Sequence, residues 1–374
     1  MKAAILEGPH DIQYLDVKNP TVGPNDILIQ VKYVGICGSD NHMYDGSNAL
    51  ISYPITPGHE FSGIVTEFGR DVKAGKDGKS NFKNISVGDL VAIEPTTGCM
   101  KCAPCKENKR NLCDYVKIIG CHSDGAMAEY VSVPAYTVHK ALKVHGDLEK
   151  DALLAALAEP AAVGIHSSRK GNVELERHGN SYFVIGAGII GIMAANAINY
   201  LSDGQKKVFI SDLDESRLKI AENLGCANHF VKPRSTNPVD FVEQLSSAGL
   251  YGLHNRGFDA VIDAVGAGNS LETAIHLACK ESGVIVQLEV SDKPKNILIN
   301  LKRETTIRGS RVYNLDDFKK GLGMLAGTNL KELFNLQMSE DVPAVKAYEG
   351  LENVKEAFES AASGKHLKVM IKIS

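Results

Sequence analysis

The chain has 374 residues, of which 44% are hydrophobic and 23% are charged, and its formal net charge is −4. This length exceeds the roughly 250–300 residues at which a single hydrophobic core stops growing, so two domains are expected. The acidic balance gives no electrostatic reason to expect a nucleic acid or an anionic membrane as a partner, and no apolar run is long enough to span a bilayer.

The first 155 residues or so are expected to be rich in β-strands. They contain short runs of Val, Ile, Tyr and Phe that are broken by Gly, Pro and Asp, which is typical of strands bounded by turns. These runs are DILIQVKYVGI at 26–36, FSGIVTEFG at 61–69, VGDLVAIEP at 87–95 and GAMAEYVSVP at 125–134. The polar stretch at 73–84 is expected to be an exposed loop.

After this region the pattern changes to alternating helices and strands. Residues 147–170 have helical spacing, and residues 181–202 look like a buried strand that runs into a helix. Further strands are predicted at 207–212, 258–266 and 283–290, and further helices at 215–225 and 270–280. This alternation predicts a parallel sheet covered by helices. The chain ends on a strand-like stretch at 366–374.

A glycine-rich turn follows the strand predicted to start at residue 181. VIGAGIIG places Gly186, Gly188 and Gly191 in a G-x-G-x-x-G pattern, with Ile189 and Ile190 between the last two glycines. At the end of a strand and the start of a helix, this pattern predicts a site for a dinucleotide pyrophosphate. The alternative is that the glycines serve only packing.

An acidic residue at the end of the next strand bears on the choice of cofactor. Asp212 lies 21 residues after Gly191, where a carboxylate accepts hydrogen bonds from a ribose 2′-hydroxyl and repels a 2′-phosphate. NAD is therefore predicted in preference to NADP. Arg217, one helical turn further on, weakens that preference, and Asp212 could instead cap the following helix.

Four cysteines lie close together in GCMKCAPCKENKRNLC. The thiols of Cys99, Cys102, Cys105 and Cys113 follow a C-x2-C-x2-C-x7-C spacing that can surround one zinc ion. Four protein ligands leave no open coordination position, so such a zinc would be structural. An iron–sulfur cluster and a zinc-knuckle nucleic-acid module are the competing interpretations.

A second set of ligand types is scattered over the first 160 residues. Cys37, His59 and Glu60, with Glu159, offer a thiolate, an imidazole and carboxylates, which suit a catalytic zinc that keeps one position open. Each residue alone has a structural explanation, such as a core cysteine or a turn histidine. Ser39 and His42, just after Cys37, are placed to carry a proton away from a group bound at such a metal.

Over essentially its whole length, the chain resembles the zinc-dependent medium-chain dehydrogenase/reductase family. The motifs that carry the resemblance are GICGSDNH, PGHEFSG, the four-cysteine stretch, AEPAAVGIH and VIGAGIIG, in the family's order and at about its spacing. Ethanol-type enzymes of the family usually have a cysteine at the position of Glu159. The glutamate here resembles the sorbitol/polyol and threonine dehydrogenase branches, which have a glutamate at that position. YPITPGHEFSG and GSRVYN look closer to the polyol branch.

The resemblance implies an α/β protein with a GroES-like β-rich catalytic domain and a Rossmann domain with a doubly wound parallel sheet. The catalytic domain would comprise residues 1–157 and 312–374, with the structural zinc lobe at about 95–115, and the Rossmann NAD-binding domain would comprise 158–311. Each chain would hold two zinc ions. The catalytic zinc would bind Cys37, His59 and Glu60, with Glu159 bound directly or through a water.

The implied reaction is the oxidation of a secondary alcohol of a polyol or sugar alcohol, or of its phosphate ester, with hydride transfer to NAD. Its proton would leave through Ser39, the cofactor ribose and His42. L-Threonine 3-dehydrogenase and a butanediol-type dehydrogenase are the alternatives within the family. A zinc-free quinone-type reductase and a non-enzymatic dinucleotide-binding protein are the alternatives outside the class. We expect a cytoplasmic homodimer or homotetramer without a nucleic acid or membrane partner.

Overall fold

The computed structural model describes residues 1–48, 51–72, 85–175, 179–252, 256–288 and 298–374. Their contacts divide the chain into two compact units. The first unit comprises Met1–Glu159, Asn314–Ala326 and Glu340–Ser374, and the second comprises Pro160–Tyr313 and Gly327–Ser339. The loop predicted at 73–84 lies outside the described residues. No helix among those residues is both long and apolar enough to cross a bilayer.

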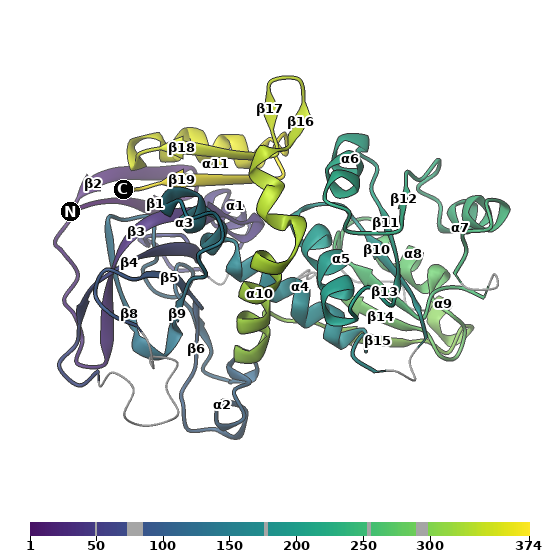
Figure 1. Ribbon diagram of the computed structural model, residues 1–374, viewed down its shortest axis with the longest axis horizontal. Helices are drawn as coiled ribbons and strands as arrows, with labels where there is room; N and C mark the ends of the chain where they lie inside the picture. Colours follow the sequence, from purple (N-terminus) through teal and green to yellow (C-terminus); the bar gives the residue numbers. More distant parts are fainter. Residues whose placement is uncertain (49–50, 73–84, 176–178, 253–255, 289–297) are drawn as a thin grey trace. The chain divides into compact units, whose positions relative to one another are not determined.

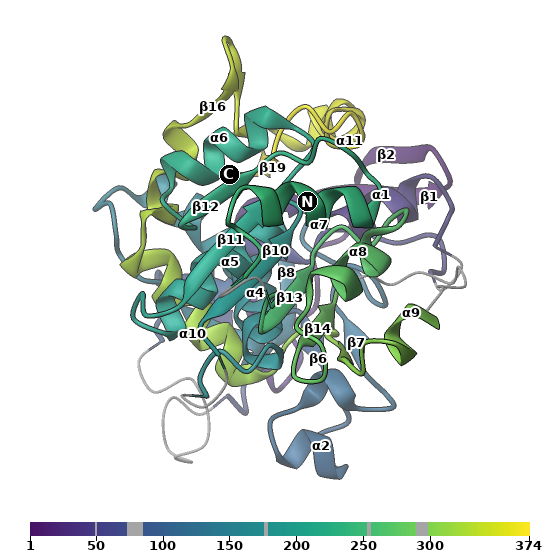
Figure 2. The same ribbon diagram turned by 90° about the vertical axis from the view of Figure 1, so that its right-hand side faces the viewer.

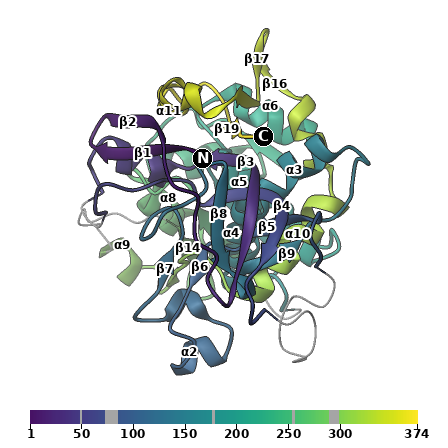
Figure 3. The ribbon, with the colours of Figure 1, turned by 90° about the vertical axis from the view of Figure 1, so that its left-hand side faces the viewer.

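The first unit is built on a seven-stranded sheet with the order β18-β19-β3-β4-β5-β9, in which β8 also pairs with β3 (Figure 1, Figure 3). The strands of the whole unit, including those outside this sheet, are β1 (Lys2–Gly8), β2 (Asp11–Asp16), β3 (Asp26–Ile36), β4 (Glu60–Phe68), β5 (Leu90–Ile93), β6 (Thr96–Thr97), β7 (Lys117–Ile118), β8 (Tyr130–Pro134), β9 (Val138–Lys140), β17 (Val342–Pro343), β18 (Val345–Glu349) and β19 (Lys368–Lys372). Its helices are α1 (Gly38–Tyr44), α2 (Ala103–Lys106), α3 (Leu148–Ala156) and α11 (Val354–Ala362), while α10 (Leu315–Gly327) ends one residue beyond the division.

Strand β3 is the centre of this sheet because it pairs with β4, β8 and β19. Burial alternates over its first eight residues, as expected for a strand with one face in the core, and Tyr33–Ile36 at its end are all buried. The C-terminal strand β19 runs antiparallel to β3, so the end of the sequence folds beside its first quarter. This pairing brings Lys368 next to the turn that follows β3, a placement that matters for the site described below.

The second unit contains a six-stranded parallel sheet with the order β12-β11-β10-β13-β14-β15 (Figure 2). The strands of this sheet are β10 (Ser181–Ile185), β11 (Lys207–Ser211), β12 (His229–Val231), β13 (Ala260–Asp263), β14 (Val284–Gln287) and β15 (Thr306–Gly309), and the unit also contains β16 (Gln337–Ser339). Its helices are α5 (Ile189–Leu201), α6 (Glu215–Asn223), α7 (Pro238–Ser247), α8 (Ser270–Leu277) and α9 (Leu298–Leu301), and α4 (Ala158–Lys170) begins at the division between the units.

Counted from β10, the strand order is 3-2-1-4-5-6, the order of the Rossmann fold. The strands read as continuous apolar runs because helices cover both faces of a parallel sheet. An aromatic cluster fills one face, where Phe183 packs against Phe209, Phe241 and Phe258. The predicted α/β class with a doubly wound parallel sheet is therefore confirmed.

Candidate active site

Cys37, His59 and Glu60 come together in the first unit. Cys37 directly follows β3 and caps α1. His59 directly precedes β4 and Glu60 is its first residue, and β4 pairs with β3 so that Gly35 faces Glu60. The antiparallel pairing therefore places the end of β3 beside the beginning of β4. One ligand atom from each of the three residues lies within 4.8 Å of the other two.

A buried carboxylate that the sequence analysis did not single out orients two of these ligands. Asp40 is fully buried; its Oδ2 accepts the backbone N–H of Cys37 at 2.7 Å, and its Oδ1 lies 3.4 Å from Nδ1 of His59. The Cys121 thiol lies 3.7 Å from the same nitrogen. With Nδ1 engaged by Asp40 and Cys121, the second ring nitrogen of His59 is the one left to bind a metal.

The charge of Asp40 also acts on the protonation of His59. Burial favours the neutral imidazole, but the negative charge of Asp40, with a smaller contribution from Cys121, outweighs burial and raises the pKa of His59 well above its usual value. A metal cation at the ring would have to displace that proton. The same carboxylate that holds the ring in place thus provides the negative charge that such a cation would meet.

Lys368 is the second residue that the sequence analysis missed. It is buried, and its ammonium pairs with Glu60 Oε2. Burial opposes its charged form, but Glu60 and Cys37 outweigh burial and raise the pKa of Lys368. A Cβ on Gly35 would collide with both side chains of this pair, so the glycine leaves the space in which they meet. Glu60 thus has a cationic partner as well as a position beside Cys37 and His59.

The other residues predicted for this site lie outside that three-residue set. Glu159 is buried in the first turn of α4. Ser39 and His42 lie on α1, where Ser39 is partly exposed and His42 is exposed. His42 directs its Nδ1 to the Ser47 hydroxyl at 2.9 Å.

The donor chemistry of the Cys37, His59 and Glu60 set fits zinc. One thiolate, one imidazole and one carboxylate are three protein ligands, the number found in catalytic zinc sites that keep a fourth position for water or substrate. His59 and Glu60 are buried and Cys37 is partly exposed, so Cys37 is the most exposed residue of the set. This arrangement can polarise an oxygen bound at the open position.

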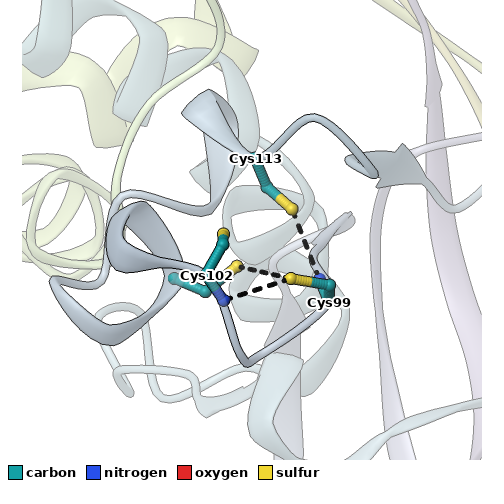
Figure 4. Close-up of side chains that lie close together, drawn as sticks. Cys99, Cys102 and Cys113 are labelled. Carbon is teal, nitrogen blue, oxygen red and sulfur yellow. Dashed lines mark hydrogen bonds between the residues drawn. The ribbon is translucent and has the colours of Figure 1, made fainter.

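The four cysteines predicted to bind a structural zinc form a compact cluster (Figure 4). Their sulfur atoms lie within 4.8 Å of one another, and the Cys99 and Cys105 sulfurs are 4.0 Å apart. A tetrahedral zinc with Zn–S bonds of about 2.3 Å would place two sulfurs about 3.8 Å apart. The cluster therefore fits a four-thiolate zinc.

Backbone N–H groups favour the thiolate form of Cys99 in this cluster, whereas burial raises the pKa of Cys105 to about 12. Cys113 Sγ accepts the backbone N–H groups of Cys99 and Tyr115 at 3.4 Å, and Cys99 Sγ accepts that of Cys102 at the same distance. Hydrogen bonds from the backbone of Lys101 and Cys102 lower the pKa of Cys99 to about 6. Thiolates, rather than thiols, are the metal ligands, so these N–H donors favour the binding form.

A buried ion pair joins the four-cysteine lobe to the sheet of the first unit. Arg110, between the third and fourth cysteines, pairs with Glu94 just after β5, and both side chains are buried. His139 on β9 lies 3.4 Å from the same Glu94 oxygen, and the Arg110 guanidinium lies 5.0 Å from the ring centroid of Tyr136. Sequence spacing gave no sign of this pair, because its partners come from separate segments.

Replacing Glu94 by Gln is expected to destabilise the first unit. Removing one partner of a buried pair leaves the Arg110 charge uncompensated, which costs about 3 kcal/mol. The expected fall in the thermal midpoint is roughly 6–12 °C for a unit of this size, and a chelator should remove the lobe zinc faster. Circular dichroism melts and zinc release to a chromogenic chelator measure both effects.

Glu107→Gln is the matched control, because Glu107 forms an exposed ion pair with Lys109 in the same lobe. An exposed pair contributes little, so its midpoint should stay within about 1–2 °C of the parent. Equal midpoints for the two variants would contradict the structural role given to Glu94.

A pocket of about 240 Å³ lies at the carboxyl ends of the strands in the second unit. It is lined by Gly186 of the glycine-rich turn, by Asp212 and Arg217 after β11, and by Val265 after β13. It therefore lies at the switch point between β10 and β13, where Rossmann sheets bind dinucleotides.

The glycines of the turn meet different surroundings. Gly186 has φ +96°, which disfavours any other residue. A Cβ on Gly191 would collide with the carbonyl oxygen of Gly186, whereas a Cβ on Gly188 would meet no atom within 4 Å. Gly191 thus serves packing, whereas Gly188 leaves open space just before α5, which begins with Ile189 and Ile190.

Asp212 connects the turn to the end of β11. Its Oδ2 accepts the backbone N–H of Ala187 at 2.7 Å, and its Oδ1 accepts that of Asp214 at 2.8 Å. The interpretation of Asp212 as the helix cap does not apply, because Asp214 caps α6 through the backbone N–H of Ser216. Arg217 lies 3.9 Å from the Asp214 carboxylate. A carboxylate, with a guanidinium nearby, thus lines the pocket that the fold offers to a ribose.

Each unit contains a region that matches a known protein family. The alcohol dehydrogenase GroES-like domain matches residues 23–143, and the zinc-binding dehydrogenase domain matches residues 186–327. The chain is also 33% identical over 374 residues to the probable D-xylulose reductase A of Arthroderma otae, covering 98% of this chain and 96% of the relative. The chain belongs to the zinc-dependent medium-chain dehydrogenase/reductase family. The predicted GroES-like and Rossmann folds are confirmed, and this dehydrogenase is an oxidoreductase.

Two solved structures show the same fold around a bound cofactor. One, named a short chain alcohol dehydrogenase, comes from Escherichia coli CFT073 and holds NADH; it is 25% identical to this dehydrogenase, with a TM-score of 0.81 and coverage of 100% of this chain and 99% of that one. The other is a putative zinc-binding dehydrogenase from Sinorhizobium meliloti 1021 bound to NADP, with 26% identity, a TM-score of 0.79 and coverage of 99% and 98%.

Proposed function

We propose that this zinc-dependent dehydrogenase oxidises a secondary alcohol of a polyol or sugar alcohol to the ketone, with NAD as the hydride acceptor. The observation that carries the proposal is the convergence of Cys37, His59 and Glu60, whose ligand atoms lie within 4.8 Å of one another, in a chain that is 33% identical to a probable D-xylulose reductase. When bound, the zinc supplies Lewis acidity to the hydroxyl oxygen and the nicotinamide accepts the hydride.

The protein residues divide the remaining work. Asp40 holds His59 in a ligating orientation, and Lys368 balances the charge of Glu60. Glu159 is our candidate to hold the fourth zinc position, directly or through a water, while no alcohol is bound there. Ser39 and His42 are proposed to pass the hydroxyl proton to solvent by way of the cofactor ribose. A positioned general base of this kind contributes about 10²–10⁴-fold to the rate.

The test is NADH formation by zinc-replete protein with a panel of xylitol, other polyols, their phosphates, 2,3-butanediol and L-threonine. Turnover of a polyol or its phosphate supports the proposal, and the stereocentre oxidised defines the substrate. Turnover confined to L-threonine or to butanediol would show that the substrate is an amino alcohol or a vicinal diol and not a polyol. A protein that oxidises none of these alcohols would contradict the proposal. Size-exclusion chromatography with light scattering would test the expected homodimer or homotetramer, and fractionation the cytoplasmic location.

The preference for NAD is proposed to come from Asp212. An Asp212→Asn variant keeps an oxygen that can accept a backbone N–H but loses the negative charge. Hydrogen bonds to charged groups contribute about 1.5–3 kcal/mol, so the ratio of kcat/KM for NAD to that for NADP should fall by about 10-fold or more. Steady-state kinetics with both cofactors measure this ratio, and an unchanged ratio would remove Asp212 from cofactor selection.

A further inference from the structure

His42 is one end of a chain of three polar side chains at the end of α1. Its Nδ1 lies 2.9 Å from the Ser47 hydroxyl oxygen, and Ser47 in turn hydrogen-bonds to the Asp45 carboxylate through its hydroxyl and, at 2.8 Å, through its backbone N–H. The His42 and Asp45 side chains are 65% and 45% exposed, so the chain ends in solvent.

The local backbone gives this arrangement its shape. Asp45 directly follows the last residue of α1 and donates its backbone N–H to the Asn41 carbonyl. Gly46 turns the chain back with φ +76°, and the Asn48 N–H donates to the His42 carbonyl at 3.0 Å. The turn therefore folds Ser47 back over the helix and against the imidazole.

The direction of these hydrogen bonds can be assigned from their chemistry. The Ser47 hydroxyl lowers the pKa of Asp45, so Asp45 is an acceptor-only carboxylate at neutral pH. Ser47 has a single O–H proton, which it donates to that carboxylate. Toward His42 the Ser47 oxygen can therefore only accept a hydrogen bond, so His42 must carry its proton on Nδ1. This tautomer leaves Nε2 as the basic nitrogen of the neutral ring.

We propose that Ser47 and Asp45 are positioning residues that make Nε2 of His42 the proton acceptor in alcohol oxidation. The inference rests on the proposed function of His42 in proton release. Nε2 takes one proton from the relay and later gives one proton to water, so the ring returns to its starting state. Asp45, 3.8 Å from Nδ1, stabilises the intervening imidazolium. The other titratable group whose charge acts on Asp45 is His10.

The first test reads the tautomer and does not depend on turnover. ¹⁵N-imidazole NMR spectra of the holoprotein, with the His42 signals assigned by their loss in His42→Gln, should show a protonated Nδ1 and an unprotonated Nε2. In Ser47→Ala and Asp45→Asn the ring should shift toward the Nε2–H tautomer, and Ser47→Thr should restore the parent pattern. A parent ring protonated on Nε2, or a tautomer unchanged by both variants, would overturn the proposal.

The second test follows the proton itself. In stopped-flow oxidation of the preferred alcohol, with a pH indicator beside NADH absorbance, Ser47→Ala and Asp45→Asn should each slow proton release by about 10-fold, less than the loss of a general base. Ser47→Thr should restore the rate, and added imidazole should accelerate the two slow variants but not the parent. Unchanged proton release would overturn the kinetic role. Failure of the parent to oxidise any alcohol would instead contradict the proposed function, while the NMR result would still decide the tautomer.

Discussion

A Cys37→Ser variant is expected to lose the catalytic zinc and to oxidise alcohol about 10³-fold or more slowly than the parent. A serine hydroxyl is a poor substitute for the thiolate that selects zinc, and the Lewis acid contributes several kcal/mol to the rate. The zinc of the four-cysteine lobe should remain, because Cys37 belongs to the other ligand set. Metal analysis and steady-state kinetics on the same preparation measure both quantities.

Cys279→Ser is the control for this variant. Cys279 is partly buried and belongs to neither ligand set, so its replacement should leave zinc content and turnover close to those of the parent. Full zinc content and full activity in Cys37→Ser would show that Cys37 does not bind the catalytic metal. Loss of both zinc ions would show that the two sites are coupled through folding.

Alanine at Gly188 and alanine at Gly191 are expected to fail in different ways. A Cβ at Gly188 meets no protein atom within 4 Å, so Gly188→Ala should melt within about 1–2 °C of the parent, yet it should weaken NADH binding by about 30-fold if the pyrophosphate occupies that space. A Cβ at Gly191 collides with the Gly186 carbonyl, so Gly191→Ala should lower both stability and affinity, with a stability loss of about 1–3 kcal/mol.

Thermal melts without cofactor and fluorescence titration with NADH separate the two effects. Destabilisation of Gly188→Ala without cofactor would show that the turn itself requires glycine at this position. Unchanged NADH affinity in Gly188→Ala would place the pyrophosphate elsewhere. In either case the comparison tests the glycine-rich turn, whose first glycine, Gly186, lines the pocket of the second unit.

The sequence was most informative where function depends on local spacing. The four cysteines lie within 15 consecutive residues, so their separations alone restrict their side chains to one small volume. The glycine-rich turn was recognisable for the same reason, since its strand, turn and helix are contiguous. The strand at 26–36 was predicted with the bounds of β3, because a run of β-branched and aromatic residues between turn residues carries its own signal.

Groups whose partners lie far apart in the chain escaped prediction. Neither Lys368 beside Glu60 nor Arg110 beside Glu94 follows from any spacing, because antiparallel pairing and loop packing decide which side chains meet. Asp40 was visible in GICGSDNH, but its contact with His59 needed the pairing of β3 with β4. The segment Gly327–Ser339 likewise belongs to the second unit although it lies between parts of the first.

The sequence by itself therefore determined the α/β architecture and the four-cysteine cluster, because local periodicity and short spacings encode these features. It determined the family through its motifs, and the scattered catalytic set was predicted from that resemblance. Only the tertiary structure decided how the ligands are supported. It placed the buried charges of Asp40, Lys368 and Glu94 against specific partners. A buried charge requires a partner, and the identity of that partner depends on which distant segments the fold brings together.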